Sequence, residues 1–494
     1  MFDNAVRLLT PDYKNLNWKT VLLILFLVAF FIRFPFFFRD YIDRDESTFI
    51  IMGQSWVDGF LPYTKLWDLK PPVTFLFFAG VIAIFGKSFL AIRFFGTLLV
   101  VCTAFFTYKI GLNIISKKVG FWCSLFCVFL FSLFGSLQGV MSEHICTLFF
   151  VAGFFILVRQ QNAWRYLLAG ILFGLSVMSK LNMAYPLLTL CLFLLWTGIQ
   201  KKNFFPAISK LITMGLGVFL IIFLTALPYF LADQQELWWR SIFEAPLAYS
   251  KVKFHSPLKA LPVALVFAAF FLGAYKFKWI DFRNHAIQMM LAVVIGVLVS
   301  FIQAGKVNGH YLIQLYPFVL IPIGMAIGKL HPIQHKYRPI IILLLVLIPI
   351  EAYLEYGNII SNKIKKGSFY NGEGIEVPRY IMENDLETKN IFLTEYHIGY
   401  WVMNVSPPTK AATHPSNITR EVLFPYMDNP RSTSMQELQY ILEEIQPKTI
   451  VARKGKRIFD KKLVELNAYI DGYLEEHYTL AHTIDRGLIY QRLE

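Results

Sequence analysis

Acidic side chains directly follow the first hydrophobic segment of the chain. The run Asp43-Arg44-Asp45-Glu46 comes just after residues 18–38. A carboxylate in this place can act as a general base, which takes a proton from an acceptor hydroxyl or amine as that group attacks an electrophile. The alternative is a solvated acidic cap on an external helix, because Asp45-Glu46-Ser47 also has the composition of a helix start. We interpret Asp45 and Glu46 as candidate catalytic residues.

A second acidic position, Glu143, stands with His144 at the start of another hydrophobic segment. A helix-start carboxylate explains Glu143 equally well when this residue is considered alone. Ionisable groups at membrane depth are costly and are therefore functional candidates, and several of them on one face are a stronger indication than one. We expect Glu143 and Asp45 on the same membrane face, which makes Glu143 a third candidate catalytic residue.

Basic side chains stand at the ends of several apolar segments. Lys70 precedes two prolines at the start of a short apolar stretch, and proline suits the first turn of a helix. A lysine there can bind a lipid phosphate as a point charge and stabilise a phosphate that leaves a sugar; the alternative is an ammonium that snorkels to the interface. For His310 the alternative is a histidine hydrogen-bonded at the interface. We expect four residues to bind a donor phosphate: Lys70, Lys180, Lys306 and His310.

The composition indicates which elements must position these side chains. Of the 494 residues, 56% are hydrophobic and only 16% are charged. Soluble domains are about one-quarter charged, so a soluble globular enzyme is excluded. We attribute the net charge of +14 to basic loops between membrane spans and to a basic tail. This charge suits a membrane surface and an anionic lipid substrate. Nucleic acid is not an expected partner, because no arginine-rich arm or aromatic RNA-binding motif accompanies the charge.

The hydrophobic segments predict a polytopic α-helical membrane protein with about eleven spans and a long first external loop. Basic residues between the spans mark the cytoplasmic side, which places the amino terminus in the cytoplasm and the candidate residues on the external face of a plasma (inner) membrane. The apolar stretch 71–85 is short and is interpreted as an interfacial or re-entrant helix. The expected spans are residues 18–38, 89–113, 119–136, 143–158, 164–178, 183–199, 208–231, 257–275, 286–303, 311–328 and 338–355.

The tail after the last span differs in composition from the rest of the chain. We predict a transmembrane catalytic domain over residues 1–355 and a small soluble extracytoplasmic α/β domain over residues 356–494. Residue patterns in the tail predict helices at 378–384, 434–445 and 459–477 and strands at 390–394, 449–452 and 488–492. We expect this domain to cover the active site or to help select the acceptor.

The cysteines offer no disulfide framework and no metal site. All five fall inside predicted spans. Cys123 and Cys127 stand one helical turn apart, but no histidine or carboxylate joins them, so we interpret them as core residues.

Several motifs, in order along the chain, resemble those of GT-C glycosyltransferases. The branch in question contains the protein O-mannosyltransferases and the lipid A aminoarabinose transferases, and is of the glycosyltransferase family 39 type. The similarity spans most of the membrane domain. The matching motifs are Asp45-Glu46, Gly59-Phe60-Leu61-Pro62-Tyr63, Asp68-Leu69-Lys70-Pro71-Pro72, Phe85-Gly86-Lys87-Ser88 with Arg93, Gly174-Leu175 to Ser179-Lys180, and Lys306 to His310-Tyr311-Leu312 with Tyr316-Pro317.

The resemblance implies an inverting transferase that moves a sugar from a polyprenyl-phosphate carrier to an acceptor on the extracytoplasmic side. It implies Asp45 as the general base, with Glu46 beside it, and Lys70 as the group that holds the carrier phosphate. Glu143 takes the place of the family's second acidic residue, where many relatives carry aspartate. Three further residues in the motifs are expected to position the substrate: Asp68, Tyr63 and Tyr311.

The chain departs from the commonest form of the family in a way that leaves two questions open. Asp68 lies one residue further from Lys70 than the adjacent acid of that form. Together with the glutamate at position 143, this leaves open both the acceptor, which is a glycolipid such as lipid A, a glycan or a protein, and the metal requirement. No cofactor is certain, and a divalent metal remains open.

A transporter or flippase for lipid-linked sugars is the alternative function. It would also need a lipid groove and internal charges, but it predicts inverted repeats and carboxylates near the bilayer midplane. The sequence has no evident repeat, and its candidate charges are expected at one face. We therefore favour the transferase.

Overall fold

The computed structural model describes residues 16–159, 162–252, 256–305, 307–329 and 338–493. The chain divides into two compact units, each assembled from separate segments. The first unit comprises Met1–Phe36, Arg93–Thr225 and Phe254–Tyr356, and the second comprises Phe37–Ile92, Ala226–Lys253 and Gly357–Glu494. The functional boundary expected between residues 355 and 356 stays a prediction.

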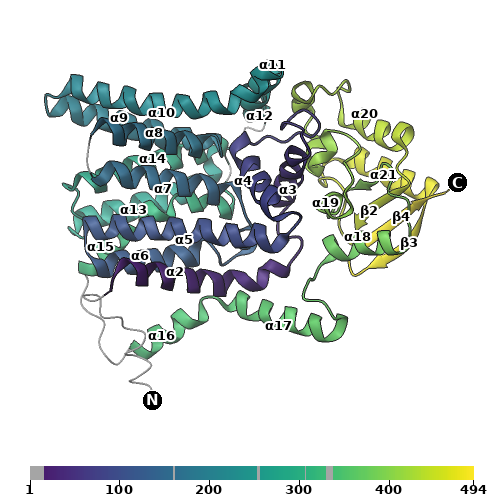
Figure 1. Ribbon diagram of the computed structural model, residues 1–494, viewed down its shortest axis with the longest axis horizontal. Helices are drawn as coiled ribbons and strands as arrows, with labels where there is room; N and C mark the ends of the chain where they lie inside the picture. The colour runs from purple at the N-terminus through teal and green to yellow at the C-terminus, as the bar shows by residue number, and fades with distance from the viewer. Residues whose placement is uncertain (1–15, 160–161, 253–255, 306, 330–337, 494) are drawn as a thin grey trace. The chain divides into compact units, whose positions relative to one another are not determined.

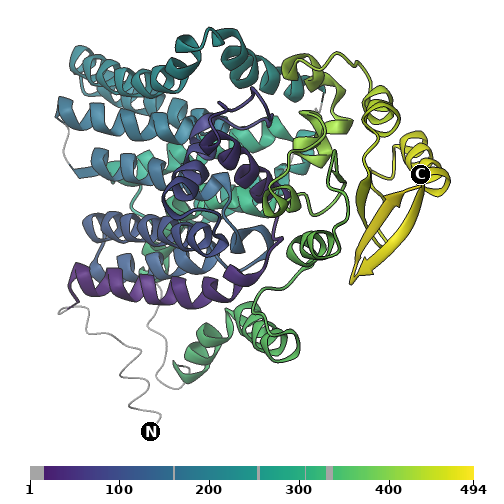
Figure 2. The same cartoon turned by 45° about the vertical axis from the view of Figure 1, so that its right-hand side comes forward.

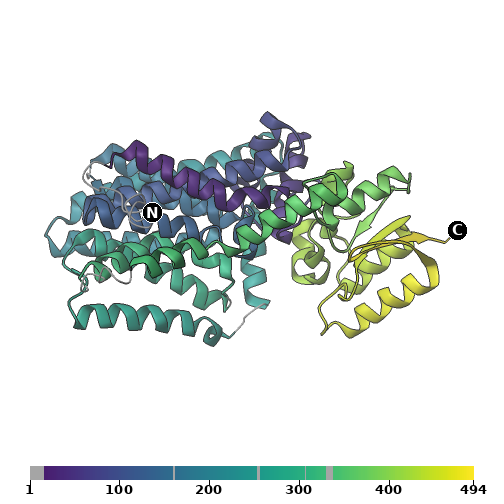
Figure 3. The same ribbon diagram turned by 90° about the horizontal axis from the view of Figure 1, so that it is seen from below.

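Helices that run roughly parallel or antiparallel to one another build the first unit (Figures 1 and 3). Contacts join α7 to α8, α9 to α14, and α6 to both α2 and α15. Helices α8 and α10 approach closely at Gly170, where an added Cβ would lie 2.0 Å from the carbonyl oxygen of Met214. The helices are α2 (Trp18–Arg33), α5 (Phe89–Ile114), α6 (Lys117–Leu130), α7 (Ser142–Arg159), α8 (Ala163–Val177), α9 (Ala184–Gln200), α10 (Phe204–Leu231), α13 (Leu261–Lys276), α14 (His285–Ala304), α15 (Tyr316–Lys329) and α16 (Arg338–Leu347); α5 begins and α10 ends in the second unit.

The lengths and composition of these helices confirm a helical membrane protein. Within the described residues, six helical segments are long and apolar enough to cross a membrane: Trp18–Phe38, Phe89–Ile114, Ser142–Arg159, Leu181–Gln200, Phe204–Leu231 and His285–Ala304. Four apolar helices are shorter: Pro72–Phe85, Ala163–Val177, Leu261–Lys276 and Tyr316–Lys329. The count of eleven spans stays a prediction, as does the interfacial position of the short helix Pro72–Phe85.

Several expected spans have different bounds in the structure. The span expected at 119–136 ends at Leu130 as α6, and the span expected at 257–275 begins at Leu261 as α13; proline explains two further differences. The expected span 338–355 is divided between α16 and α17 (Ile350–Lys366), with Pro349 at the break. The expected span 311–328 starts later, because Gly309–Gln314 forms the 3₁₀-helix η6 and α15 begins at Tyr316, next to Pro317. Proline has no N–H to donate inside a helix but fits its first turn.

The second unit combines helices with a small sheet (Figures 1 and 2). The strands lie in the order β1-β2-β4-β3, with β1 parallel to β2 and the other neighbours antiparallel. Helices α3 and α4 pack against each other, and α19 contacts α3. The elements are α3 (Arg44–Val57), α4 (Pro72–Phe85), α11 (Gln235–Trp239), α12 (Ala245–Val252), α18 (Glu373–Glu383), β1 (Phe392–Leu393), α19 (Gly399–Met403), α20 (Ser434–Gln439), β2 (Thr449–Arg453), α21 (Val464–His477), β3 (Tyr478–Ile484) and β4 (Gly487–Arg492).

The tail is the α/β structure that its sequence predicts, with three corrections. The helix expected at 378–384 begins earlier, at Glu373, and ends at Glu383. Strand β3 was not expected, since only its first residue, Tyr478, is buried and the strand lacks the apolar alternation of a half-buried strand. The helix expected from residue 459 begins at Val464. A loop precedes it and is held by the Asn467 side chain of α21, which accepts from the Phe459 N–H at 3.1 Å and donates to the Asp460 carbonyl at 3.0 Å.

Asp40 is a buried carboxylate near the start of the second unit. Its Oδ1 accepts from the Tyr41 N–H at 2.6 Å. It also packs against Gly372, whose φ is 115° and where an added Cβ would lie 1.9 Å from Oδ1. Burial raises the pKa of Asp40 to about 7, and the charge of Glu373 adds to this effect.

The raised pKa of Asp40 predicts a pH-dependent stability. The folded protein binds this proton more tightly than the unfolded chain, so the contribution is complete below about pH 4 and is lost as the pH rises toward 7. The loss amounts to at most about 4 kcal/mol. We expect Asp40→Asn to melt at a higher temperature than the wild type at pH 8 and at a similar temperature at pH 4. Equal effects at both pH values would contradict this account.

Candidate functional site

The first group of candidate residues, the Asp45 cluster, consists of Asp45, Lys70 and His414. Asp45 lies in the first turn of α3, where the N-cap Asp43 accepts from the Asp45 N–H at 2.8 Å. The Lys70 Nζ lies 3.3 Å from Asp45 Oδ2, and the His414 Nε2 lies 3.4 Å from Asp45 Oδ1. The Asp45 side chain is 33% exposed. It is therefore held by two basic groups and is still accessible to a reactant.

Two aromatic residues contact Lys70. The Tyr63 hydroxyl donates to the Lys70 carbonyl oxygen at 2.5 Å, and the Lys70 ammonium lies 5.3 Å from the centre of the Phe49 ring. Burial raises the pKa of Tyr63 well above its ordinary value, so its hydroxyl keeps the proton that it donates. The structure thus places Tyr63 where it orients the Lys70 backbone; contact with a substrate stays a prediction for Tyr63.

Two further acidic candidates of the second unit are buried. Glu46 is 1% exposed and lies on α3 next to Asp45. Asp68 is 3% exposed, and its Oδ2 has no hydrogen-bond partner within the part of the chain that the structure describes. Their burial distinguishes both from Asp45, which is the accessible carboxylate of the three.

The tail contributes residues that the sequence did not indicate. Glu395 forms ion pairs with Arg44 and with Lys456, the latter at 2.9 Å. Burial alone would raise the pKa of Glu395, but the positive charges of Arg44 and Lys456 outweigh burial and hold that pKa below its ordinary value. These pairs tie the first residue of α3, immediately before Asp45, to the tail.

His397 supports the same end of α3. Its Nε2 lies 3.1 Å from the Arg44 carbonyl oxygen and 2.9 Å from the Thr48 hydroxyl. Burial lowers the pKa of His397 well below its ordinary value, so the ring is neutral. No motif or spacing relates His397, Glu395 or His414 to residues some 350 positions earlier, and sequence reasoning had no signal for them.

The second group, the Glu143 cluster, consists of Glu143, Lys180 and His310 in the first unit. Glu143 lies in the first turn of α7, is 1% exposed, and accepts from the Ser142 hydroxyl at 3.0 Å. Its Oε1 forms an ion pair with Lys180 and lies 3.7 Å from His310 Nε2. The Lys180 ammonium also lies 4.3 Å from the centre of the Tyr311 ring. The structure thus brings the candidate residues 143, 180, 310 and 311 together, and their expected roles stay predictions.

Arg33 fixes the loop that leads into Glu143. Its guanidinium is fully buried and donates to the carbonyl oxygens of Leu137 at 2.6 Å and Gly139 at 2.7 Å. It also donates to the Phe131 carbonyl at 3.3 Å. The planar group with its several donors satisfies backbone oxygens that would otherwise be buried without partners. No motif in the sequence indicated this role for Arg33, which lies inside the expected span 18–38.

Lys306 lies outside the described residues. The expectation that the candidate residues open into a single external site stays a prediction. Within the described ranges, no group of three or more histidine, cysteine, aspartate or glutamate residues could hold a metal ion.

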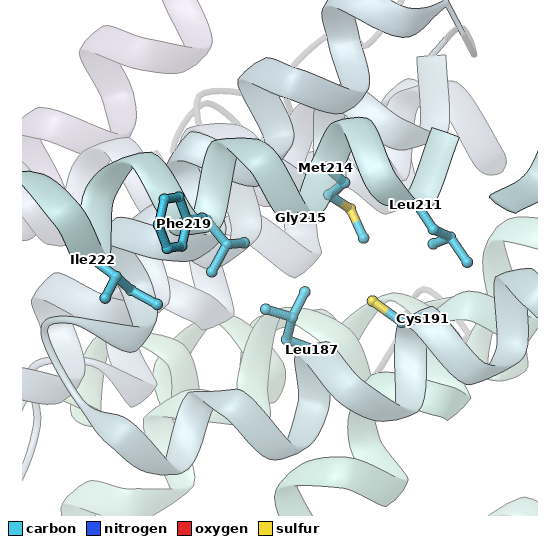
Figure 4. Close-up of a pocket in the computed structure, with 8 residues that line it drawn as sticks. Leu187, Cys191, Leu211, Met214, Gly215, Phe219 and Ile222 are labelled. Atoms are coloured by element: carbon cyan, nitrogen blue, oxygen red, sulfur yellow. The ribbon is translucent and has the colours of Figure 1, made fainter. Parts of the chain in front are cut away.

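An apolar cavity of about 280 Å³ lies between α9 and α10 (Figure 4). It is lined by Leu187, Cys191, Leu211, Met214, Gly215, Val218, Phe219 and Ile222. The lining suits a hydrocarbon chain and contains no residue of either cluster.

Comparisons with known proteins bear on the class of protein. Residues 69–229 match the family described as dolichyl-phosphate-mannose-protein mannosyltransferase. This stretch begins one residue before Lys70 and includes Glu143 and Lys180. No curated protein matches the chain in sequence.

Solved structures share the fold at low sequence identity. ArnT from Cupriavidus metallidurans bound to undecaprenyl phosphate aligns with a TM-score of 0.59 and 11% identity, over 96% of this chain and 97% of that chain. The apo state of the same protein gives 0.55 and 10%, over 96% and 98%. The apo oligosaccharyltransferase of Archaeoglobus fulgidus gives 0.50 and 12%, over 90% and 70%. The family match and the shared fold confirm the recognition of a GT-C glycosyltransferase of the protein mannosyltransferase and ArnT type.

The buried Glu143–Lys180 pair predicts a non-additive effect on stability. Lys180→Met leaves the Glu143 charge with less compensation and should lower the free energy of unfolding by about 3 kcal/mol. Adding Glu143→Gln removes that charge and should restore most of the loss, which thermal unfolding in detergent will measure. Additive losses in the double variant would show that the pair does not carry the effect.

Proposed function

We propose that the protein transfers a sugar from a polyprenyl-phosphate carrier to an acceptor, with inversion at the anomeric carbon. The observation that carries the proposal is the accessible Asp45 carboxylate with the Lys70 ammonium 3.3 Å from one of its oxygens. Such a transfer needs a base for the acceptor proton and positive charge for the leaving phosphate. The family match and the structural likeness to ArnT, which was crystallised with undecaprenyl phosphate, support this choice of donor.

The reaction requires the Asp45–Lys70 pair to open. An inverting transfer places the base and the leaving phosphate on opposite faces of the sugar. When the donor phosphate binds, the Lys70 ammonium therefore breaks its ion pair with Asp45 and pairs with the phosphate instead. Both side chains are partly exposed, at 33% and 23%, and an exposed ion pair is worth only about 0–1 kcal/mol. Charge-assisted hydrogen bonds to the phosphate are stronger than that, so the exchange is favourable.

The chemical step then balances as follows. Asp45 takes the proton of the acceptor hydroxyl or amine while the acceptor atom forms its bond to the anomeric carbon. The bond from that carbon to the phosphate oxygen breaks, and polyprenyl phosphate leaves with the electron pair. Lys70 stabilises the charge that develops on this oxygen.

We propose that two members of the Glu143 cluster, Lys180 and His310, form a second group of hydrogen-bond donors for the carrier phosphate. Glu143 is 1% exposed, which leaves no room for an acceptor at its carboxylate, so its proposed role is to hold Lys180 and His310. Lys180 and His310, with Lys306, are proposed to contact the carrier phosphate. Tyr311 and Asp68 are proposed to position the substrate, and Glu46 to support Asp45.

The proposed setting is a plasma (inner) membrane with the active site on the extracytoplasmic side. The acceptor is a glycolipid, a glycan or a protein. The tail, residues 356–494, is proposed to lie on the same side and to complete the site. Glu395 and His414 support this role, because both reach the N-terminal turn of α3.

The assay for this function follows the carrier and does not require knowledge of the acceptor. Purified protein in detergent is incubated with a panel of polyprenyl-phosphate sugars and an envelope extract, and the released polyprenyl phosphate is measured by mass spectrometry. A transferase consumes one of the donors. A flippase would leave all of them intact and would move them across the bilayer of a proteoliposome.

Asp45→Asn should lower the rate of donor consumption by about 10²-fold or more, because the amide cannot accept the proton. Binding of undecaprenyl phosphate should persist. Asp58→Asn is the matched control, since Asp58 is an exposed carboxylate at the other end of α3. Near-normal turnover of Asp45→Asn in a folded protein would assign the base to another residue.

Lys70→Met should weaken binding of undecaprenyl phosphate by about 10-fold or more, because a charged hydrogen bond is worth roughly 1.5–3 kcal/mol. Lys65→Met removes an exposed lysine of the same loop and should leave binding unchanged. Affinity can be measured by competition with a fluorescent polyprenyl phosphate. Equal affinities of the two variants would remove Lys70 from the phosphate site.

A further inference from the structure

We infer that His414, contributed by the tail, is a positioning residue that sets the orientation of the Asp45 carboxylate. The inference rests on the proposed function of Asp45 as the general base. His414 is 4% exposed, and its Nε2 lies 3.4 Å from Asp45 Oδ1. Catalytic hydrogen bonds are often this long in enzymes without substrate and tighten in the reacting complex.

The surroundings of His414 decide which ring nitrogen carries the proton. His414 is the N-cap of the short 3₁₀-helix Pro415–Thr419, and its Nδ1 accepts from the Ser416 N–H at 3.1 Å. A nitrogen that accepts a hydrogen bond has no proton, so the neutral ring carries its proton on Nε2. The cap therefore fixes the tautomer that presents an N–H to Asp45.

The two oxygens of Asp45 consequently have different environments. Oδ2 faces Lys70, and Oδ1 faces the ring N–H of His414. When the Lys70 ammonium pairs with a donor phosphate, the His414 N–H still donates to Asp45 Oδ1. Oδ2 is then released in a fixed orientation, and it is the oxygen that accepts the proton. Orientation matters here because a displacement of about 1 Å in a reacting group can cost on the order of 100-fold in rate.

The neighbours of His414 hold the ring in this position. The His397 ring lies 5.8 Å away between ring centres, and His397 is itself bonded to the Arg44 carbonyl. Arg44 is paired with Glu395. The chain of contacts thus runs from the tail to the turn that carries Asp45, within one compact unit.

Two substitutions separate the two roles of the His414 side chain. Asparagine is a favoured N-cap and can keep the bond from Ser416, but its short side chain has no donor that reaches Asp45. Glutamine is longer, and its amide N–H can take the place of the Nε2 proton. His414→Asn therefore removes the contact with Asp45 and keeps the cap, while His414→Gln keeps the contact with Asp45.

Steady-state kinetics will use the undecaprenyl-phosphate sugar that the wild type consumes. We expect His414→Asn to lower kcat by about 10- to 100-fold with KM for the donor changed less than about twofold, because Lys70 is untouched. His414→Gln should recover most of kcat. A kcat of His414→Asn close to that of the wild type would overturn the inference. Equal losses of kcat and of melting temperature in both variants would do so too, because they would indicate a structural role alone.

A second measurement does not depend on activity. In protein labelled with ¹⁵N-histidine, the His414 signals are those missing from His414→Asn. We expect the Nδ1 atom of His414 to be unprotonated and its Nε2 atom to be protonated. The ¹⁵N chemical shift of Nε2 should change in Asp45→Asn. A proton on Nδ1 would refute the pairing even if the protein proves to be a transferase. Conversely, a wild-type protein that consumes no polyprenyl-phosphate sugar would refute the proposed function. A His414–Asp45 pairing that the spectrum still detects would then have no catalytic role.

Discussion

Each of the carboxylates on which the two clusters depend faces at least one lysine or arginine side chain. Asp45 faces Lys70 and His414, Glu143 faces Lys180 and His310, and Glu395 faces Arg44 and Lys456. A carboxylate removed from water is stable as an anion only when it is paired and hydrogen-bonded. The partners come from segments distant in the chain, so the charges that would do the chemistry also join those segments.

Accessibility distinguishes the roles of the two clusters. Asp45 is one-third exposed, so it can exchange its partner for a substrate at little cost. Glu143 is buried, and breaking its ion pair costs several times more stability than opening the Asp45–Lys70 pair, on the order of 3–5 kcal/mol. The first arrangement suits a group that must accept a proton and release it. The second suits a fixed scaffold for Lys180 and His310.

Much of the fold followed from local patterns. Long apolar runs predicted the helices, and the tail patterns predicted β2, β4 and the helix after Thr433. The errors have two sources, a strand without an apolar pattern and an apolar run that contains a break. Strand β3 is exposed and shows no apolar alternation, and the division of the last expected span at Pro349 interrupts an otherwise continuous apolar signal. No local pattern indicated the role of Arg33, because this role depends on the backbone carbonyl groups that surround its guanidinium in the folded protein.

Composition and local patterns are enough to predict a helical membrane protein in which Asp45, Lys70, Glu143, Lys180 and His310 stand at the ends of its elements. These properties depend on composition and on neighbours within a few residues, which can be read directly. Which residues meet depends on tertiary packing. His414 reaches Asp45, and Glu395 reaches Arg44, because the whole second unit packs as one body. Contacts across some 350 residues depend on that packing and leave no periodic or local trace in the chain.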